Sequence, residues 1–251
     1  MDQRPIGMFD SGCGGLTVLK EFIKELPHED FIYYGDTAHL PYGDKSKEKI
    51  VEYSEEIVKF LLQKDVKMIV IACGTASAMA YDYLKEKYSG VPIINIIEPT
   101  AKEVREKEIG VIATKGTIKS KAWEKAILKY HPETHITSVA CPLLVPLIEE
   151  GFSNHSATNL VLQEYLRSFK DISSLILGCT HYPILKEQIQ TILGNSINII
   201  NAGTYAAQET LKTLNSLHIE NSIHHQGTLS FYSSDDFESF KENAKILDFY
   251  I

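Results

Sequence analysis

Short apolar runs alternate along the chain with stretches in which apolar residues recur at helical spacing. An apolar run bounded by glycine, proline or small polar residues is typical of a buried strand, and an amphipathic stretch predicts a helix that covers it. Repeated alternation of the two indicates parallel sheets with helices on both faces. The strands expected are residues 5–9, 31–34, 68–72, 91–97, 109–113, 136–140, 175–177, 197–200 and 229–232.

The helical stretches fall between these runs. The first follows a glycine-rich turn at residues 10–15, and the second is expected to begin after Ser46 as its N-cap. Residues 37–44 are polar and carry a proline, so they predict a surface loop. Further helices are expected over residues 77–88, around 122–128, and over 143–150, 154–169 (capped by Asn154 or Ser156), 204–217 and 235–247.

Two cysteines hold the same place in two of these strand–helix units. Residues 68–78 read MIVIACGTASA and place Cys73 after an apolar run, and residues 175–184 read LILGCTHYPI with Cys179 at the equivalent point. The repeat is weak, but the shared order of strand, cysteine and helix predicts an α/β fold of two pseudo-symmetric α/β domains. Their sheets should be mainly parallel, with the active site in the cleft between them.

The expected domains are residues 1–97 together with 207–251, and residues 98–206. Ligands of such sheets bind beyond the carboxyl ends of the strands. Polar residues stand at five of these ends: Asp10, Asp36, Cys73, Thr114 and Cys179. Polar side chains at so many strand ends indicate a single cleft.

The composition narrows the classes of function. A chain of 251 residues with 44% apolar residues can bury a large core, and a net charge of −8 offers no basic surface for a phosphate backbone. The amino terminus has no apolar leader, and no stretch approaches the ~20 apolar residues of a membrane span. We therefore expect a cytoplasmic protein that has neither nucleic acid nor a membrane as its partner.

The cysteines occur singly, without a C-x-x-C pair. This spacing disfavours a disulfide framework and a structural zinc site, so no metal is expected. Cys13 and Cys141 are interpreted as packing residues. Cys73 and Cys179, at two strand ends, are candidates for a nucleophile or a base.

Several other chemistries lack the motifs they need. Residues 12–17 miss the third glycine of the dinucleotide fingerprint, and the chain has no G-x-x-x-x-G-K-[ST] phosphate loop. No arginine follows Cys73 within a turn, as a cysteine phosphatase would require. A Cys–His protease built on Cys179 and His181 would leave Cys73 without a role.

Two thiols on opposite walls of a small site suit proton transfer at the α-carbon of an amino acid. One base removes the proton and one acid returns it from the other face, which inverts the centre without a cofactor. A helix N-terminus directly after each cysteine is expected to lower the thiol pKa. The hydroxyls of Thr75 and Thr180 suit an α-carboxylate. Three further groups, Asp10, Glu149 and His181, are candidates to assist the thiols or hold the ammonium group.

Five ordered motifs carry a resemblance to a known family. They read FDSGCGGL at residues 9–16, YGDTAHLPYG at 34–43, ACGTASA at 72–78, VPLIE at 145–149 and LGCTHYP at 177–183. Together they resemble bacterial glutamate racemase, of the aspartate/glutamate racemase family, and the match runs colinearly from Ile6 to the carboxyl terminus. The resemblance implies interconversion of L- and D-glutamate that needs no cofactor and supplies D-glutamate for peptidoglycan synthesis. It also implies a homodimer.

The resemblance assigns roles to residues of this chain. The catalytic residues that it implies are Cys73 and Cys179, supported by Asp10, Glu149 and His181. The substrate-binding residues that it implies are Asp10, Ser11, Tyr42, Gly43, Gly74, Thr75, Thr114, Thr117, Thr180 and His181.

The chain departs from the family at Gly74, where an asparagine usually follows the first cysteine. Loss of that amide would remove one or two substrate hydrogen bonds, each worth roughly 0.5–1.5 kcal/mol net. Two alternatives therefore stand beside glutamate racemisation. One is a racemase for aspartate or another amino acid, and the other is a catalytically silent binding protein on the same scaffold.

Overall fold

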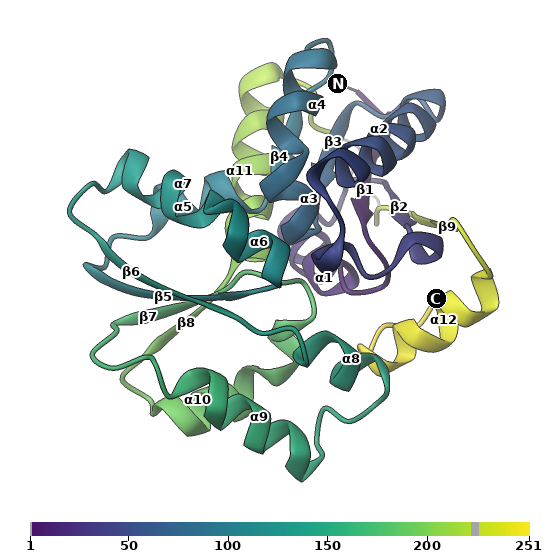
Figure 1. Cartoon of the computed structure of the whole chain (residues 1–251). Coiled ribbons are helices and arrows are strands. Elements are labelled where there is room, and N and C mark those ends of the chain that lie inside the picture. Colours follow the sequence, from purple (N-terminus) through teal and green to yellow (C-terminus); the bar gives the residue numbers. More distant parts are fainter. Residues whose placement is uncertain (1, 222–225) are drawn as a thin grey trace.

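Two parallel β-sheets flanked by helices make up the protein in a computed structural model, which describes residues 2–221 and 226–251 (Figure 1). Within these residues the first sheet has the order β4-β3-β1-β2-β9 and the second the order β6-β5-β7-β8. The predicted α/β class with parallel sheets is thus confirmed. The strands are β1 Ile6–Asp10, β2 Phe31–Gly35, β3 Met68–Ile71, β4 Ile93–Asn95, β5 Glu108–Ala113, β6 His135–Ala140, β7 Ser174–Leu177, β8 Asn198–Asn201 and β9 Leu229–Ser233.

The second sheet repeats the strand order of the first. Read from the opposite edge, β8-β7-β5-β6 matches β4-β3-β1-β2, so β3 and β7 occupy equivalent places. Cys73 lies two residues beyond β3, and Cys179 lies two residues beyond β7. The two thiols therefore follow equivalent strands. The domain boundaries expected at residues 97 and 206 fall within helices of the structure and stay a prediction.

Side chains of the first sheet alternate between two cores. Met8 and Val70 face the core that contains Leu16 and Phe22, whereas their neighbours Phe9 and Ile71 face a separate core on the other side. Successive side chains of a strand point to opposite faces, so a strand covered on both sides needs an unbroken apolar run. This explains why the strands were readable from the sequence.

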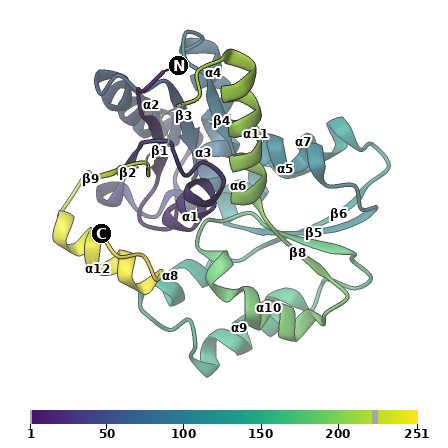
Figure 2. The ribbon, with the colours of Figure 1, turned by 180° about the vertical axis from the view of Figure 1, so that it is seen from behind.

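Helices cover both faces of each sheet. The helices α5, α6 and α7 lie on one side of the second sheet and α9 and α10 on the other, as opposite views show (Figures 1 and 2). Their bounds are α1 Leu16–Glu25, α2 Lys47–Gln63, α3 Gly74–Met79, α4 Tyr81–Lys87, α5 Ile97–Glu103, α6 Lys115–Ser120, α7 Ala122–Tyr130, α8 Leu144–Glu149, α9 Ser156–Leu166, α10 Lys186–Leu193, α11 Ala202–Leu217 and α12 Phe237–Ile246. No helix of the described segments has both the length and the apolar content needed to span a membrane.

The structure corrects several predicted elements. The strand expected over residues 91–97 ends at Asn95, whose Oδ1 accepts hydrogen bonds from the N–H groups of Ile97 and Glu98 at the start of α5. The apolar run continues through this point, which hid the end of the strand. The helix expected over residues 77–88 is two helices, α3 and α4, and the helix expected directly after Cys179 begins only at Lys186, as α10. Two short helices, α5 and α6, were not expected.

The caps of two other helices were also predicted. Ser46 is the N-cap of α2, where its side chain accepts a hydrogen bond from the N–H of Lys49, as expected. The cap of α9 is His155 and neither Asn154 nor Ser156, because the His155 imidazole accepts from the N–H of Ala157. Histidine is not among the preferred N-cap residues, so the pattern pointed to its neighbours.

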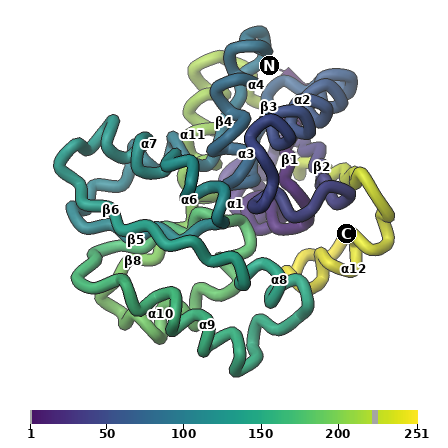
Figure 3. Tube along the Cα trace, in the orientation of Figure 1, coloured from purple at the N-terminus to yellow at the C-terminus, as the bar shows by residue number. Residues whose placement is uncertain are grey.

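The carboxyl-terminal segment returns to the first sheet. β9 pairs with β2 at the edge of that sheet, and α12 then contacts both β9 and α8 (Figure 3).

The loop at residues 37–44 forms two short 3₁₀ helices, η1 Thr37–His39 and η2 Tyr42–Asp44, instead of irregular backbone. This loop and α8 both border the site described next.

Candidate active site

A cavity of about 300 Å³ lies at the carboxyl ends of strands from both sheets. Of the residues predicted to form the site, the following line it: Ser11, Tyr42, Gly43, Cys73, Gly74, Thr75, Thr114, Glu149, Cys179, Thr180 and His181. Two predicted residues, Asp10 and Thr117, lie behind the lining and are bonded to residues in it. A larger groove of about 790 Å³ opens beside α3 and α6 but contains neither cysteine.

Cys73 is the N-cap of α3, and its Sγ lies 3.5 Å from the N–H of Ala76. Burial, reinforced by the nearby charge of Asp10, raises the pKa of the Cys73 thiol to about 12. The expectation that a helix N-terminus lowers this pKa is wrong for Cys73. The single N–H that faces the sulfur does not compensate for the loss of water around a thiolate.

The second thiol has different surroundings. After Cys179 the chain makes a turn and then the 3₁₀ helix η3 (Tyr182–Leu185), so the α-helix N-terminus expected directly after it is absent. Instead, Sγ of Cys179 lies 3.9 Å from Nδ1 of His181, and Nε2 of the same ring lies 3.0 Å from Oε1 of Glu149. A thiol, an imidazole and a carboxylate thus form a chain that can hold and pass a proton.

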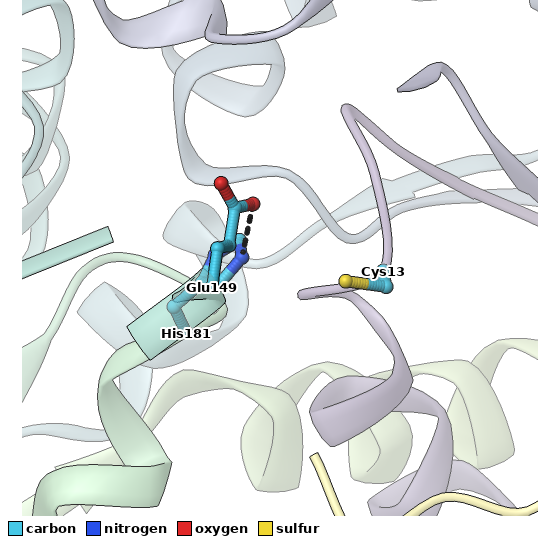
Figure 4. Close-up of side chains that lie close together, drawn as sticks. All are labelled: Cys13, Glu149 and His181. Carbon is cyan, nitrogen blue, oxygen red and sulfur yellow. Dashed lines mark hydrogen bonds and ion pairs between the residues drawn. The ribbon is translucent and has the colours of Figure 1, made fainter. Parts of the chain in front are cut away.

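Electrostatics favour a proton on this imidazole. Burial alone would lower the pKa of His181, but hydrogen bonds with two cysteines and with Glu149 outweigh burial and raise that pKa well above its usual range. The two cysteines are Cys179 and Cys13, which points toward the Glu149–His181 pair (Figure 4). The interpretation of Cys13 as a packing residue missed its contact with His181, because no motif or residue spacing in the sequence indicates that contact.

Asp10 ends β1 and is fully buried. Its Oδ2 accepts hydrogen bonds from the N–H groups of Gly12 and Gly15, and its Oδ1 accepts from the Thr180 hydroxyl at 3.4 Å. Burial raises the pKa of Asp10, while the charge of His181 and these hydrogen bonds oppose the rise. Asp10 therefore joins the turn after β1 to the turn that carries Cys179.

The glycine-rich turn lets that second turn approach closely. A Cβ at Gly14 would overlap the imidazole of His181 and would lie 2.6 Å from the Thr180 hydroxyl. In addition, the Thr17 hydroxyl donates to the Thr180 carbonyl at 2.6 Å. Thr17 was not among the predicted site residues. Its contact joins residues far apart in the sequence, and no local pattern shows such a contact.

Three threonines meet across the two halves of the chain. The Thr75 hydroxyl lies 3.0 Å from that of Thr114 and 3.3 Å from that of Thr117, and the last two are 2.9 Å apart. Thr75 belongs to α3, whereas Thr114 caps α6. Hydroxyl groups can each donate and accept, so this cluster can turn its donors toward an anionic group in the cavity.

The loop after β2 brings Tyr42 and Gly43 to the cavity. The Tyr42 hydroxyl donates to Asp36 at 2.5 Å, and Nδ1 of His39 lies 2.8 Å from the same carboxylate. Burial and the Asp36 carboxylate raise the pKa of the Tyr42 hydroxyl, so it stays a hydrogen-bond donor. Asp36, which was expected at the cleft because it follows a strand, thus fixes this loop without lining the cavity.

Further lining residues were not predicted. They come from residues 141–150, which include α8, from the loop after β2, and from single positions elsewhere: Leu40, Pro41, Asp44, Lys115, Cys141, Pro142, Val145, Pro146, Glu150 and Gly178. Cys141 was interpreted as packing. The Cys141 residue is fully buried, and this burial raises the pKa of its thiol to about 12.

Gly74 lies against the opposite half of the chain. A Cβ at this position would overlap the carbonyl oxygen of Gly178 and lie 3.3 Å from its carbonyl carbon. Gly178 comes directly before Cys179, so the two cysteine-bearing turns touch at Gly74. The departure from the family's usual asparagine therefore coincides with a close approach of backbone to backbone.

Comparison with known proteins identifies the family of this chain. The sequence profile described as Asp/Glu/Hydantoin racemase matches residues 12–210. The chain belongs to the Asp/Glu/Hydantoin racemase family. Within the family, the glutamate racemase of Geobacter metallireducens is 42% identical over 241 residues, which cover 94% of this chain and 89% of that protein. The glutamate racemase of Streptococcus gordonii is 42% identical over 98% of this chain and 95% of its own length.

A solved structure of the family has the same fold. Glutamate racemase from Francisella tularensis, crystallised in complex with D-glutamate, is similar at a TM-score of 0.93 and 40% identity, and covers 100% of this chain and 96% of its own. The predicted resemblance to the aspartate/glutamate racemase family is confirmed. The roles of the individual site residues stay predictions.

The raised pKa of Cys73 has a measurable consequence. A thiol with pKa of about 12 is ionised at pH 7 only to a fraction on the order of 10⁻⁵. We expect the rate of Cys73 alkylation by iodoacetamide to rise about tenfold per pH unit through about pH 9, where a thiol of ordinary pKa levels off. Peptide mass spectrometry measures the rate, and far-UV circular dichroism at each pH reports any general unfolding. A plateau near pH 8.5 for Cys73 alone would contradict the expectation.

Proposed function

We propose that this protein interconverts L- and D-glutamate by proton transfer between Cys73 and Cys179 at the substrate Cα, with no cofactor. One observation carries the proposal: both cysteines line the same small cavity, and they reach it from equivalent strands of the two sheets. Two thiols that approach from the two halves of a chain can serve the two faces of one carbon.

Glutamate is the proposed substrate because relatives of similar sequence bear that activity in their names. Two of them are 42% identical to this chain over more than nine tenths of its length, and a family structure holds D-glutamate. The cavity also offers donors for two carboxylates. Thr75 and Thr114 of the threonine cluster line it, and so does Thr180. A racemase for aspartate remains the alternative within the same chemistry.

The proton transfers balance without any added reactant. A thiolate takes the Cα proton and becomes a thiol, the carbanion that forms is stabilised by the adjacent carboxylate, and the second thiol gives its proton to the opposite face. At the end the two sulfurs have exchanged protonation states, and the next turnover in the reverse direction restores them. Catalysis by positioned acids and bases of this kind contributes about 10²–10⁴-fold to a rate.

The surroundings assign different duties to the two sulfurs. Because the raised pKa of Cys73 keeps it protonated at neutral pH, we infer that it is the acid before substrate binds. His181 holds a proton 3.9 Å from Cys179 and can return it when that sulfur acts as the acid. Glu149 supports the imidazole from its other side, and Asp10 holds the turn at Thr180 in place.

Deuterium exchange tests the proposed function. Purified protein in D₂O should incorporate deuterium at Cα of either glutamate enantiomer while optical rotation decays to zero, because both steps use solvent-exchangeable thiol protons. NMR follows the Cα signal, and aspartate in a parallel tube serves as the substrate control. Absence of exchange with both enantiomers of glutamate would refute the proposal, and exchange with aspartate alone would establish the alternative substrate.

The cellular setting is proposed from the family resemblance. We infer that the enzyme acts in the cytoplasm as a homodimer and supplies D-glutamate for peptidoglycan. Depletion should then be rescued by D-glutamate in the medium, and sedimentation equilibrium should give twice the 28.2 kDa mass of the chain. If D-glutamate failed to restore growth, the supply of D-glutamate for peptidoglycan would be contradicted. A monomer at all concentrations would contradict the homodimer.

A further inference from the structure

Three chemically different metal ligands converge beside the cavity: Cys13, Glu149 and His181. Cys13 lies in the glycine-rich turn after β1, Glu149 ends α8, and His181 follows β7. One ligand atom of each lies within 4.8 Å of those of the other two. Figure 4 shows the Cys13 sulfur directed toward the hydrogen-bonded pair of Glu149 and His181. The reaction proposed above gives Cys13 no role.

We propose that this cluster binds a zinc-type divalent cation and that the bound ion inhibits the enzyme. Thiolate, imidazole and carboxylate are the three donors that Zn²⁺ takes in proteins, and a site with three protein ligands leaves one tetrahedral position for water. Magnesium and calcium prefer oxygen ligands, so a sulfur and a nitrogen donor select against them.

The geometry requires only small adjustments. Tetrahedral zinc holds nitrogen, oxygen and sulfur ligands at about 2.0–2.3 Å, which places the ligand atoms roughly 3–4 Å from one another. Glu149 Oε1 and His181 Nε2 already lie 3.0 Å apart. The ligand atoms all lie within 4.8 Å of one another, so the more distant ones must move by roughly 1 Å to reach that spacing. Two protons pass to solvent when the metal binds: that of the Cys13 thiol and that of His181 Nε2.

The cation has a route to the cluster. Cys13 and His181 are buried, but the Glu149 side chain is 27% exposed and lines the cavity together with His181. An ion that enters the cavity therefore meets the carboxylate first. The site is distinct from the pair of Cys73 and Cys179, which can also attract soft metals, so the test must separate the two.

Inhibition follows from the ring nitrogen that the metal occupies. With Nε2 bound to the ion, the remaining proton of the imidazole is fixed on Nδ1, which faces Cys179. The ring can then no longer take up a second proton and return it to the sulfur. This step rests on the proposed function, whereas metal binding by the three side chains does not.

Zinc titration of variants tests the site by activity. We expect micromolar-range zinc to inhibit the wild-type protein reversibly, with EDTA restoring the rate. In Cys13→Ala and Cys13→Ser the concentration that halves each variant's own zinc-free rate should rise by at least ~10–100-fold, since even outer-shell changes cost a metal site that much. Cys141→Ala, which removes another buried thiol near the cavity, is the matched control and should keep the wild-type response. An unchanged response in both Cys13 variants overturns the proposal.

Zinc-edge X-ray absorption of the wild-type protein gives a test that does not depend on activity. One equivalent of zinc should show a single sulfur at about 2.3 Å among nitrogen and oxygen ligands at about 2.0 Å. Cobalt should show one thiolate-to-metal charge-transfer band that disappears in Cys13→Ser. Two sulfur ligands would place the ion on Cys73 and Cys179 instead, and no sulfur would place it elsewhere, so either result overturns the proposal. A single sulfur in a protein without racemase activity would support the site and refute the function alone.

Discussion

Replacement of either Cys73 or Cys179 by serine is expected to abolish racemisation. An alcohol is a far weaker acid than a thiol, so the variant loses one of the two groups that must exchange a proton with Cα. Loss of a positioned general acid or base costs about 10²–10⁴-fold. The rate measured by circular dichroism should therefore fall by at least that factor in both variants, with D- or L-glutamate as the starting enantiomer.

The single variants also separate the two faces of the substrate. Each retains one thiol, which can still remove the Cα proton of the enantiomer that faces it, and solvent deuterium then returns from the same side. We expect slow exchange with retention of configuration, for one enantiomer in Cys73→Ser and for the other in Cys179→Ser. NMR combined with chiral chromatography detects this. Near-full racemisation in either variant, with Cys141→Ser as the control thiol substitution, would show that two cysteines are not required.

Asparagine at Gly74, the residue usual in the family, is expected to impair this particular protein. A side chain at this position overlaps the Gly178 carbonyl, and that carbonyl belongs to the backbone directly before Cys179. The two turns would have to separate by roughly 1 Å, and a displacement of that size in a catalytic group can cost on the order of 100-fold in rate. Overpacking of this kind also destabilises a protein by about 1–3 kcal/mol.

Gly74→Ala and Gly74→Asn measure this effect in steps. Both should lower kcat/KM and the midpoint of thermal unfolding, and Gly90→Ala is the matched control because a Cβ at Gly90 meets no atom within 4 Å. If Gly74→Asn matched the unmodified protein in both measurements, the close approach of the two turns would not limit the enzyme. If both variants lose activity and stability as expected, packing explains the glycine, and Gly74 does not imply the loss of function of a silent binding protein.

The fold was readable from the sequence because its strands are buried on both faces. Met8 and Phe9 enter different cores, and such strands need continuous apolar runs. Element ends were less readable where an apolar run continues past the end of the strand, as it does beyond Asn95. Short helices such as α3 and α4 merged in the pattern because the two follow each other with a single residue, Ala80, between them.

The sequence predicted those residues of the candidate site that stand at strand ends or in recognisable motifs. Cys73 and Cys179 could be paired because each follows an equivalent strand. The surroundings that tune them could not be predicted, because the contacts join residues remote in sequence: Thr17 with Thr180, and Glu149 with His181. The pKa of the Cys73 thiol was expected to be lowered but is raised, because the thiol is buried. That burial comes from the tertiary fold and has no local pattern in the sequence.

The unlike surroundings of the two thiols place a thermodynamic constraint on the kinetics of a racemase. L- and D-glutamate are mirror images with equal free energies in water, so their equilibrium constant is unity and detailed balance makes kcat/KM the same in both directions. One direction begins at a sulfur near Asp10 and the other at a sulfur beside His181. Any advantage that either setting gives to turnover must therefore be offset by weaker apparent binding of the same enantiomer. The asymmetry of the site can appear only as values of kcat and KM that differ between the two enantiomers by the same factor.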